Sequence, residues 1–168
     1  MQNSQAWRPS KFVLGKNGYE ASQNLDEVHL GSRFIVNLQA RVCEKLIKEH
    51  AFGRLLDLGC GKVPLYEVYK NYISDNVCVD WPQTLHKSSH LDYEMNLNNE
   101  IPLPSEHFDT ILATDVLEHI TNPDLLWKEI ARLLRQKGKI IIPSVRNSGA
   151  TLNPLSSGLF FVQKSPTF

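Results

Sequence analysis

The sequence contains few cysteines, no excess of either charge and no long apolar run. Its three cysteines, Cys43, Cys60 and Cys78, form no CxxC pair, which excludes a disulfide framework or a zinc knuckle and is typical of the reducing cytoplasm. The 18 Lys and Arg residues balance 18 Asp and Glu residues, so the basic excess typical of nucleic-acid binding is missing. No stretch approaches the ~20 apolar residues of a membrane span. Because residues 1–10 also lack the apolar segment of a secretory signal, we expect a cytoplasmic protein that binds neither nucleic acid nor a membrane.

The composition that remains is that of an ordinary globular domain. The chain has 168 residues, of which 42% are apolar, enough for one sizeable core but not for two full domains. Residues 1–30 are polar and carry Pro9 and two glycines without sustained periodicity, so we expect an irregular N-terminal arm. We assign residues 31–143 to the folded domain. Residues 144–168, which contain no acidic residue, are expected to form an atypical tail.

Short apolar runs alternate with segments of helical periodicity. Helical spacing of apolar residues predicts helices over 32–50, 65–72 and 123–137. The last of these has Asn122 as its cap, Pro123 in its first position and Gly138 as its stop signal. The apolar runs predict strands at 54–58, 77–80, 90–95, 108–113 and 139–143. Such alternation is typical of a parallel sheet covered by helices, so we predict an α/β, Rossmann-like doubly wound fold.

The turn Gly59-Cys60-Gly61 follows the first buried strand of this pattern. Glycines there let the backbone bend sharply and let a ligand approach closely. A helix behind the turn presents free N–H groups. Asp80 ends the next predicted strand, where an acid can accept both hydrogen bonds of a ribose diol. The sequence therefore predicts a nucleoside site at the carboxyl ends of the strands.

Two residues bear on which nucleoside cofactor binds. A dinucleotide fingerprint, G-x-G-x-x-G/A, requires a small residue where Pro64 stands. Asp57, inside the strand, would repel a pyrophosphate and attract an ammonium group. S-adenosylmethionine, with its amino group and sulfonium, therefore fits better than NAD. An NAD-linked oxidoreductase remains the alternative, because both cofactors use the same strand geometry.

Four segments in order, 55–61, 79–80, 108–119 and 126–142, resemble a class I S-adenosylmethionine-dependent methyltransferase of the small-molecule type. The resemblance implies methyl transfer to an acceptor not yet identified, with S-adenosylhomocysteine as product. By this resemblance Asp57 and the backbone of Gly59, Cys60 and Gly61 would line the methionine end of the cofactor, and Asp80 would bind the ribose hydroxyls. Trp81 would lie beside the adenine, and Asn96 and Leu97 occupy the position from which the family reaches the adenine amino group. Thr114 and Asp115 would close the pocket near the methionine and the acceptor entrance. Asn96 stands where the family more often has Asp, and Val63 replaces the turn's third glycine.

Neither a catalytic residue nor a metal site is predicted. In-line methyl displacement depends mostly on positioning the two reactants, and Glu118-His119 lacks the second histidine of a zinc motif. Residues 144–168 are also too short for the hairpin and helix with which the family completes its sheet. The chain is therefore truncated, or its tail is aberrant, or a partner covers the exposed edge. We predict that residues 159–162 join the sheet or that a homodimer forms through it; a cofactor-binding protein without turnover is the alternative function.

Overall fold

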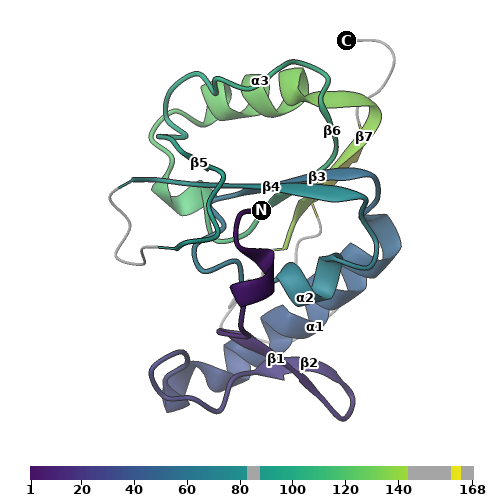
Figure 1. Cartoon of the computed structure of the whole chain (residues 1–168). Helices are drawn as coiled ribbons and strands as arrows, with labels where there is room; N and C mark the ends of the chain where they lie inside the picture. The colour runs from purple at the N-terminus through teal and green to yellow at the C-terminus, as the bar shows by residue number, and fades with distance from the viewer. Residues whose placement is uncertain (83–87, 144–159, 164–168) are drawn as a thin grey trace, which may run out of the picture.

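A six-stranded sheet forms the centre of the computed structural model, which describes residues 1–82, 88–143 and 160–163 (Figure 1). The strand order is β5-β4-β3-β6-β7-β8. These strands are β3 (Arg54–Leu58), β4 (Asp75–Asp80), β5 (Tyr93–Glu94), β6 (Phe108–Ala113), β7 (Leu134–Ile142) and β8 (Phe160–Gln163). β3 to β7 pair in parallel, and β8 pairs antiparallel to β7. The predicted doubly wound, mostly parallel sheet is confirmed.

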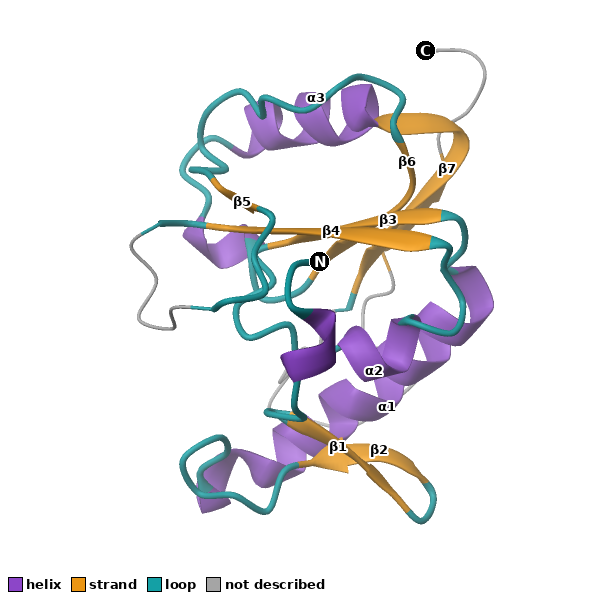
Figure 2. Ribbon diagram, in the orientation of Figure 1, coloured by secondary structure: helices purple, strands orange, loops and turns teal. Residues whose placement is uncertain are grey.

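Helices cover both faces of the sheet, and each face has its own core (Figure 2). α1 (Arg33–His50) and α2 (Tyr66–Tyr69) lie on one face, and α3 (Pro123–Leu133) lies on the other. Short 3-10 turns occur at Ser4–Ala6, Leu30–Ser32 and Leu117–His119. Because side chains alternate along a strand, Leu55 joins the core under α1 while its neighbour Leu56 joins the core under α3. Within the described residues, no helix has both the length and the apolar character required to cross a membrane.

The N-terminal arm contains a β-hairpin, so the expectation of an irregular segment is wrong for residues 12–21. β1 (Phe12–Gly15) pairs antiparallel with β2 (Gly18–Ala21) around a two-residue loop that ends in Asn17. An Asn-Gly step is a hairpin signal that periodicity over a longer window does not detect. α1 holds the hairpin, because Asn37 Oδ1 accepts from the backbone N–H of Ala21 at 2.7 Å.

The boundary between α3 and β7 also differs from the sequence prediction. Asn122 caps α3 as expected, its Oδ1 accepting from the backbone N–H of Leu125 at 3.3 Å. The helix ends at Leu133, however, and Gly138 lies inside β7. The register between β6 and β7 shifts here, and a Cβ on Gly138 would lie 2.8 Å from the carbonyl oxygen of Arg135. Gly138 therefore permits a close backbone approach at an irregular point of the strand and does not stop the helix.

The edge beyond β7 is paired. β8 aligns Gln163 with Lys139 and Phe160 with Ile142, which confirms that the apolar run predicted at 159–162 adds to the sheet. Position 159 and the rest of the tail, 144–158 and 164–168, lie outside the described residues. A homodimer through this edge stays a prediction.

Candidate active site

A cavity of about 550 Å³ lies at the carboxyl ends of β3 and β6. The glycine turn and the residues after β6 form one part of its wall, and the N-terminal segment forms the rest. Its described lining is Ser10, Lys11, Phe12, Asp26, Glu27, His29, Asp57, Gly59, Cys60, Gly61, Lys62, Pro64, Leu65, Thr114 and Asp115. Six of the ten residues that the sequence predicts as cofactor contacts are therefore gathered around one cavity.

The glycine turn bends through the left-handed region of backbone space. Gly59 has φ +66° and Gly61 has φ +53°, conformations that glycine adopts without strain. The backbone N–H groups of Gly59 and Cys60 donate to the carbonyl oxygen of Val79, and that of Gly61 donates to Asp80 Oδ2 at 2.8 Å. A Cβ built on Gly61 would meet no described atom within 4 Å. The turn is thus tied to the end of β4 and leaves open space at Gly61.

Asp57 brings a carboxyl group into the buried centre of the site. Its side chain is 3% exposed, and its Oδ2 accepts from the Tyr69 hydroxyl at 3.2 Å. Burial raises its pKa to about 7, the Tyr69 hydrogen bond opposes that shift, and the charge of Asp80 adds to it. A carboxylate that is costly to ionise alone is well suited to a cationic ligand.

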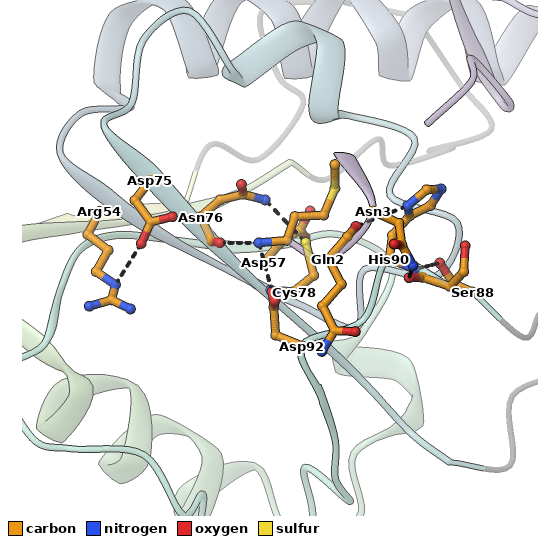
Figure 3. A network of polar contacts seen from close by, with 12 residues as sticks. Gln2, Asn3, Arg54, Asp57, Asp75, Asn76, Cys78, Ser88, His90 and Asp92 are labelled. Atoms are coloured by element: carbon orange, nitrogen blue, oxygen red, sulfur yellow. Dashed lines mark hydrogen bonds and ion pairs between the residues drawn. The ribbon is translucent and has the colours of Figure 1, made fainter. Parts of the chain in front are cut away.

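A polar network lies next to Asp57, and Figure 3 labels its members Asn76, Cys78 and Asp92. Asn76 donates from Nδ2 to the Tyr69 hydroxyl at 3.1 Å and to Cys78 Sγ at 3.2 Å. The backbone N–H of Cys78 in turn donates to Asp92 Oδ2 at 2.8 Å. The network fixes the orientation of the Tyr69 hydroxyl and therefore the position of the Asp57 carboxyl group.

The other four predicted contacts lie away from the cavity lining. Asp80 ends β4, and its Oδ1 accepts from the backbone N–H of Trp81 at 2.7 Å; the Trp81 side chain is half exposed. Asn96 accepts from Asn98 through its side-chain oxygen, in bonds of 3.0 and 3.1 Å. Leu97 is buried in the core on the α3 side of the sheet. The Asn96 side-chain oxygen is therefore already hydrogen-bonded within its own loop, and the Leu97 side chain packs in the core.

Thr114 and Asp115 follow β6 directly. Among the described atoms, the buried Thr114 Oγ1 has no hydrogen-bond partner. Asp115 has φ +55°, and its carboxylate accepts from Gln39 Nε2 at 2.9 Å and from Lys11 Nζ at 2.9 Å. The Asp115 carboxylate is thus held between α1 and the N-terminal segment at the wall of the cavity.

None of the N-terminal residues of the wall is among the ten contacts that the sequence predicts. Two ion pairs hold this part of the wall over the strand ends, Lys11 with Asp115 and Lys62 with Glu27, each at 2.9 Å. His29 also lines the cavity. Apart from the Asn-Gly hairpin step, no local signal marks these residues, because their partners lie far away in the sequence.

Val63 occupies the position of the turn's missing third glycine. It has φ +54°, which for a β-branched residue costs on the order of 1–2 kcal/mol. Val63 is fully buried, and its carbonyl oxygen accepts from Trp7 Nε1 at 3.0 Å. Burial of the side chain therefore offsets the backbone cost, and the Val63 carbonyl group ties the N-terminal segment to the turn.

Comparison with known proteins identifies the framework of this site. The methyltransferase-domain family matches residues 56–142. The ubiquinone biosynthesis O-methyltransferases of Bradyrhizobium diazoefficiens and of Rhodopseudomonas palustris strain TIE-1 are 32% and 31% identical over 104 residues, which cover 56% of this chain and 41% of each relative. The chain thus spans about two-fifths of the length of these curated relatives.

Solved structures share the fold at low identity. The YcgJ protein from a Bacillus species superposes with a TM-score of 0.54 at 18% identity, covering 65% of this chain and 53% of that one. A protein from Galdieria sulphuraria described as a sarcosine dimethylglycine methyltransferase gives a TM-score of 0.54 at 15% identity, covering 80% of this chain and 52% of that one. The matched residues 56–142 run from β3 through β7 and include the glycine turn, Asp80 and the β6 end. The chain belongs to the methyltransferase-domain family.

Proposed function

We propose that the chain is the cofactor-binding part of an S-adenosylmethionine-dependent methyltransferase and that the cavity holds the methionine end of this cofactor. The observation that carries the proposal is the buried Asp57 carboxyl group beside the open space at Gly61. A cationic ligand would compensate the buried carboxylate, and the missing Cβ leaves room for it. A pyrophosphate would meet Asp57 and Asp115 without a free lysine, since Lys11 and Lys62 are ion-paired.

The remaining predicted residues take roles consistent with this placement. Asp80 would accept hydrogen bonds from the ribose hydroxyls with the lone pairs that Gly61 and Trp81 leave free. Trp81 would lie beside the adenine, where Asn96 and Leu97 would contribute backbone contacts.

The chemistry follows from positioning. When bound, the cofactor supplies a methyl group that its sulfonium makes electrophilic. The chain's own residues hold the reactants in line and exclude water, which can contribute roughly 7–11 kcal/mol. Thr114 and Asp115 would close the pocket near the methionine end and the acceptor entrance. Because the named relatives are O-methyltransferases, we propose a small-molecule acceptor with an oxygen nucleophile.

The three unpaired thiols, Cys43, Cys60 and Cys78, support a cytoplasmic location.

Calorimetric titration with S-adenosylmethionine and S-adenosylhomocysteine tests the cofactor assignment. The wild-type chain is expected to bind both, and Asp80→Ala is expected to weaken binding roughly 10- to 100-fold, the worth of one or two hydrogen bonds to a charged group. Asp75→Ala is the matched control, because Asp75 begins the same strand at its opposite end and pairs with Arg54 on the surface. Absence of binding by the wild type would refute the proposal.

A second candidate function is cofactor binding without turnover. Titration alone does not separate it from methyl transfer, because both functions require the same cofactor site. Incubation of the wild type with methyl-labelled cofactor and a panel of phenols and catechols separates the two. A labelled acceptor supports the methyltransferase, whereas cofactor binding with no labelled product from any acceptor supports the binding protein.

A further inference from the structure

The N-terminal segment contributes an unpaired hydroxyl group to the cofactor cavity. Ser10 lines the cavity and is 6% exposed, yet its Oγ has no hydrogen-bond partner among the described atoms. An unpaired buried hydroxyl is destabilising, because it loses its hydrogen bonds to water on folding and gains none in return. Because native structures pair most buried polar groups, an unpaired one at a cavity wall points to a ligand that pairs it.

Ser10 is not alone, because Thr114 Oγ1 is a second buried hydroxyl without a partner in the described part of the chain. Thr114 lines the same cavity. The neighbours of the two residues, Lys11 and Asp115, are joined by the 2.9 Å ion pair. The ion pair therefore holds the two hydroxyl-bearing segments next to each other, although one precedes β1 and the other follows β6.

Several other donors around the cavity are already engaged. The backbone N–H groups of Gly59, Cys60 and Gly61 donate to Val79 and Asp80. Lys11 and Lys62 are both ion-paired. Apart from these, the described side-chain donors of the lining are the exposed His29, the weak Cys60 thiol and the two hydroxyls.

The methionine end of the proposed cofactor presents an ammonium group and a carboxylate, which require opposite partners. The cavity offers the ammonium group two acids outside these ion pairs, Asp26 and Asp57. It offers the carboxylate few free donors. The two unpaired hydroxyls match this need in number and in kind, since a carboxylate accepts from hydroxyl groups through both of its oxygens.

We propose that Ser10 is a cofactor-binding residue, whose hydroxyl donates a hydrogen bond to the α-carboxylate of the methionine end together with the hydroxyl of Thr114. This inference rests on the proposed cofactor. It places part of the cofactor site outside residues 56–142, the part of the chain that the family match covers. Binding of the cofactor is therefore coupled to the placement of the N-terminal hairpin over the strand ends.

Titration of wild type and Ser10→Ala with two ligands tests the proposal. S-adenosylhomocysteine carries the carboxylate, and 5′-deoxy-5′-(3-aminopropylthio)adenosine keeps the amine but lacks the carboxylate. Ser10→Ala is expected to bind S-adenosylhomocysteine about 10-fold more weakly, as for one lost hydrogen bond to a charged group. Its affinity for the second ligand is expected to equal that of the wild type.

Thermal unfolding without ligand separates this role from a structural one. Ser10→Ala is expected to leave the Tm unchanged or to raise it, because the variant removes an unpaired buried hydroxyl. Ser22→Ala is the matched control: Ser22 is also 6% exposed, but its Oγ accepts from the backbone N–H of Asn24 at 3.2 Å. Ser22→Ala should therefore lower the Tm. A lowered Tm for Ser10→Ala would show that the hydroxyl stabilises the fold, against the proposal.

Thr114→Val provides a second variant, nearly equal in shape and without the hydroxyl. It is expected to reproduce the selective loss of affinity for S-adenosylhomocysteine. Unchanged affinity in Ser10→Ala, or equal losses for both ligands, would overturn the Ser10 assignment and leave the proposed function intact. Failure of the wild type to bind S-adenosylhomocysteine would overturn both.

Discussion

Gly59→Ala is expected to be the most destabilising single substitution in the cofactor turn. The φ of +66° would place an alanine in the left-handed region, at a cost of roughly 1–2 kcal/mol. The added Cβ would also overlap Cγ2 of Val116, which is 7% exposed and packed in the core on the α3 side. Overpacking of this kind adds about 1–3 kcal/mol. The sum is a large fraction of the roughly 5–15 kcal/mol by which domains are stable.

Urea unfolding of three alanine variants measures this effect. Gly31→Ala is the control, because a Cβ there meets nothing within 4 Å and its φ is not positive. It should leave the free energy of unfolding unchanged within about 0.5 kcal/mol. Gly61→Ala should lower the free energy of unfolding by only about 1 kcal/mol, the cost of placing alanine in the left-handed region, because its Cβ enters open space. It should nevertheless weaken binding of S-adenosylmethionine by filling that space. A Gly59→Ala protein as stable as Gly31→Ala would contradict the proposed packing against Val116.

The stability of the ligand-free protein is expected to fall as the pH rises from about 4 to above 7. The folded state raises the pKa of Asp57 from 3.8 to about 7, so it binds a proton that the unfolded chain has already released. The stabilisation is fully present below pH 4 and is lost as the pH rises through 7. A shift of this size corresponds to a loss on the order of 4 kcal/mol. Asp57→Asn cannot ionise, so its stability should lack this decline.

Cofactor binding should show the opposite pH dependence. The proposed ligand is cationic and favours the ionised Asp57, so binding must release the proton wherever Asp57 is protonated. The affinity for S-adenosylmethionine should therefore rise as the pH increases from 5.5 to 7.5 and level off above it. Asp57→Asn should bind more weakly and with little pH dependence. Exposed Asp75 provides the control, and Asp75→Asn should keep the wild-type profile. A wild-type profile in Asp57→Asn would show that another group controls binding.

The elements of the central sheet could be predicted from local pattern. Strands 54–58 and 108–113 appear in the structure with the same bounds, and the cap at Asn122 is where the sequence places it. Apolar runs, helical spacing and capping residues act through near neighbours, so a single sequence displays them. The glycine turn could also be predicted from the sequence, because a positive φ at Gly59 and Gly61 strongly favours glycine at these positions.

Features that depend on distant contacts could not be predicted in this way. The sequence contains Asp57, but its pKa depends on burial among residues of several elements, including Tyr69. Lys11 lies 104 residues from Asp115, and no local pattern records that ion pair or the entry of Ser10 into the cavity. Gly138 looked like a helix stop until the register of β7 against β6 placed it within a strand. Local patterns determine which residues can form a helix, strand or turn, whereas charge, burial and the walls of the cavity follow from the packing of the whole chain.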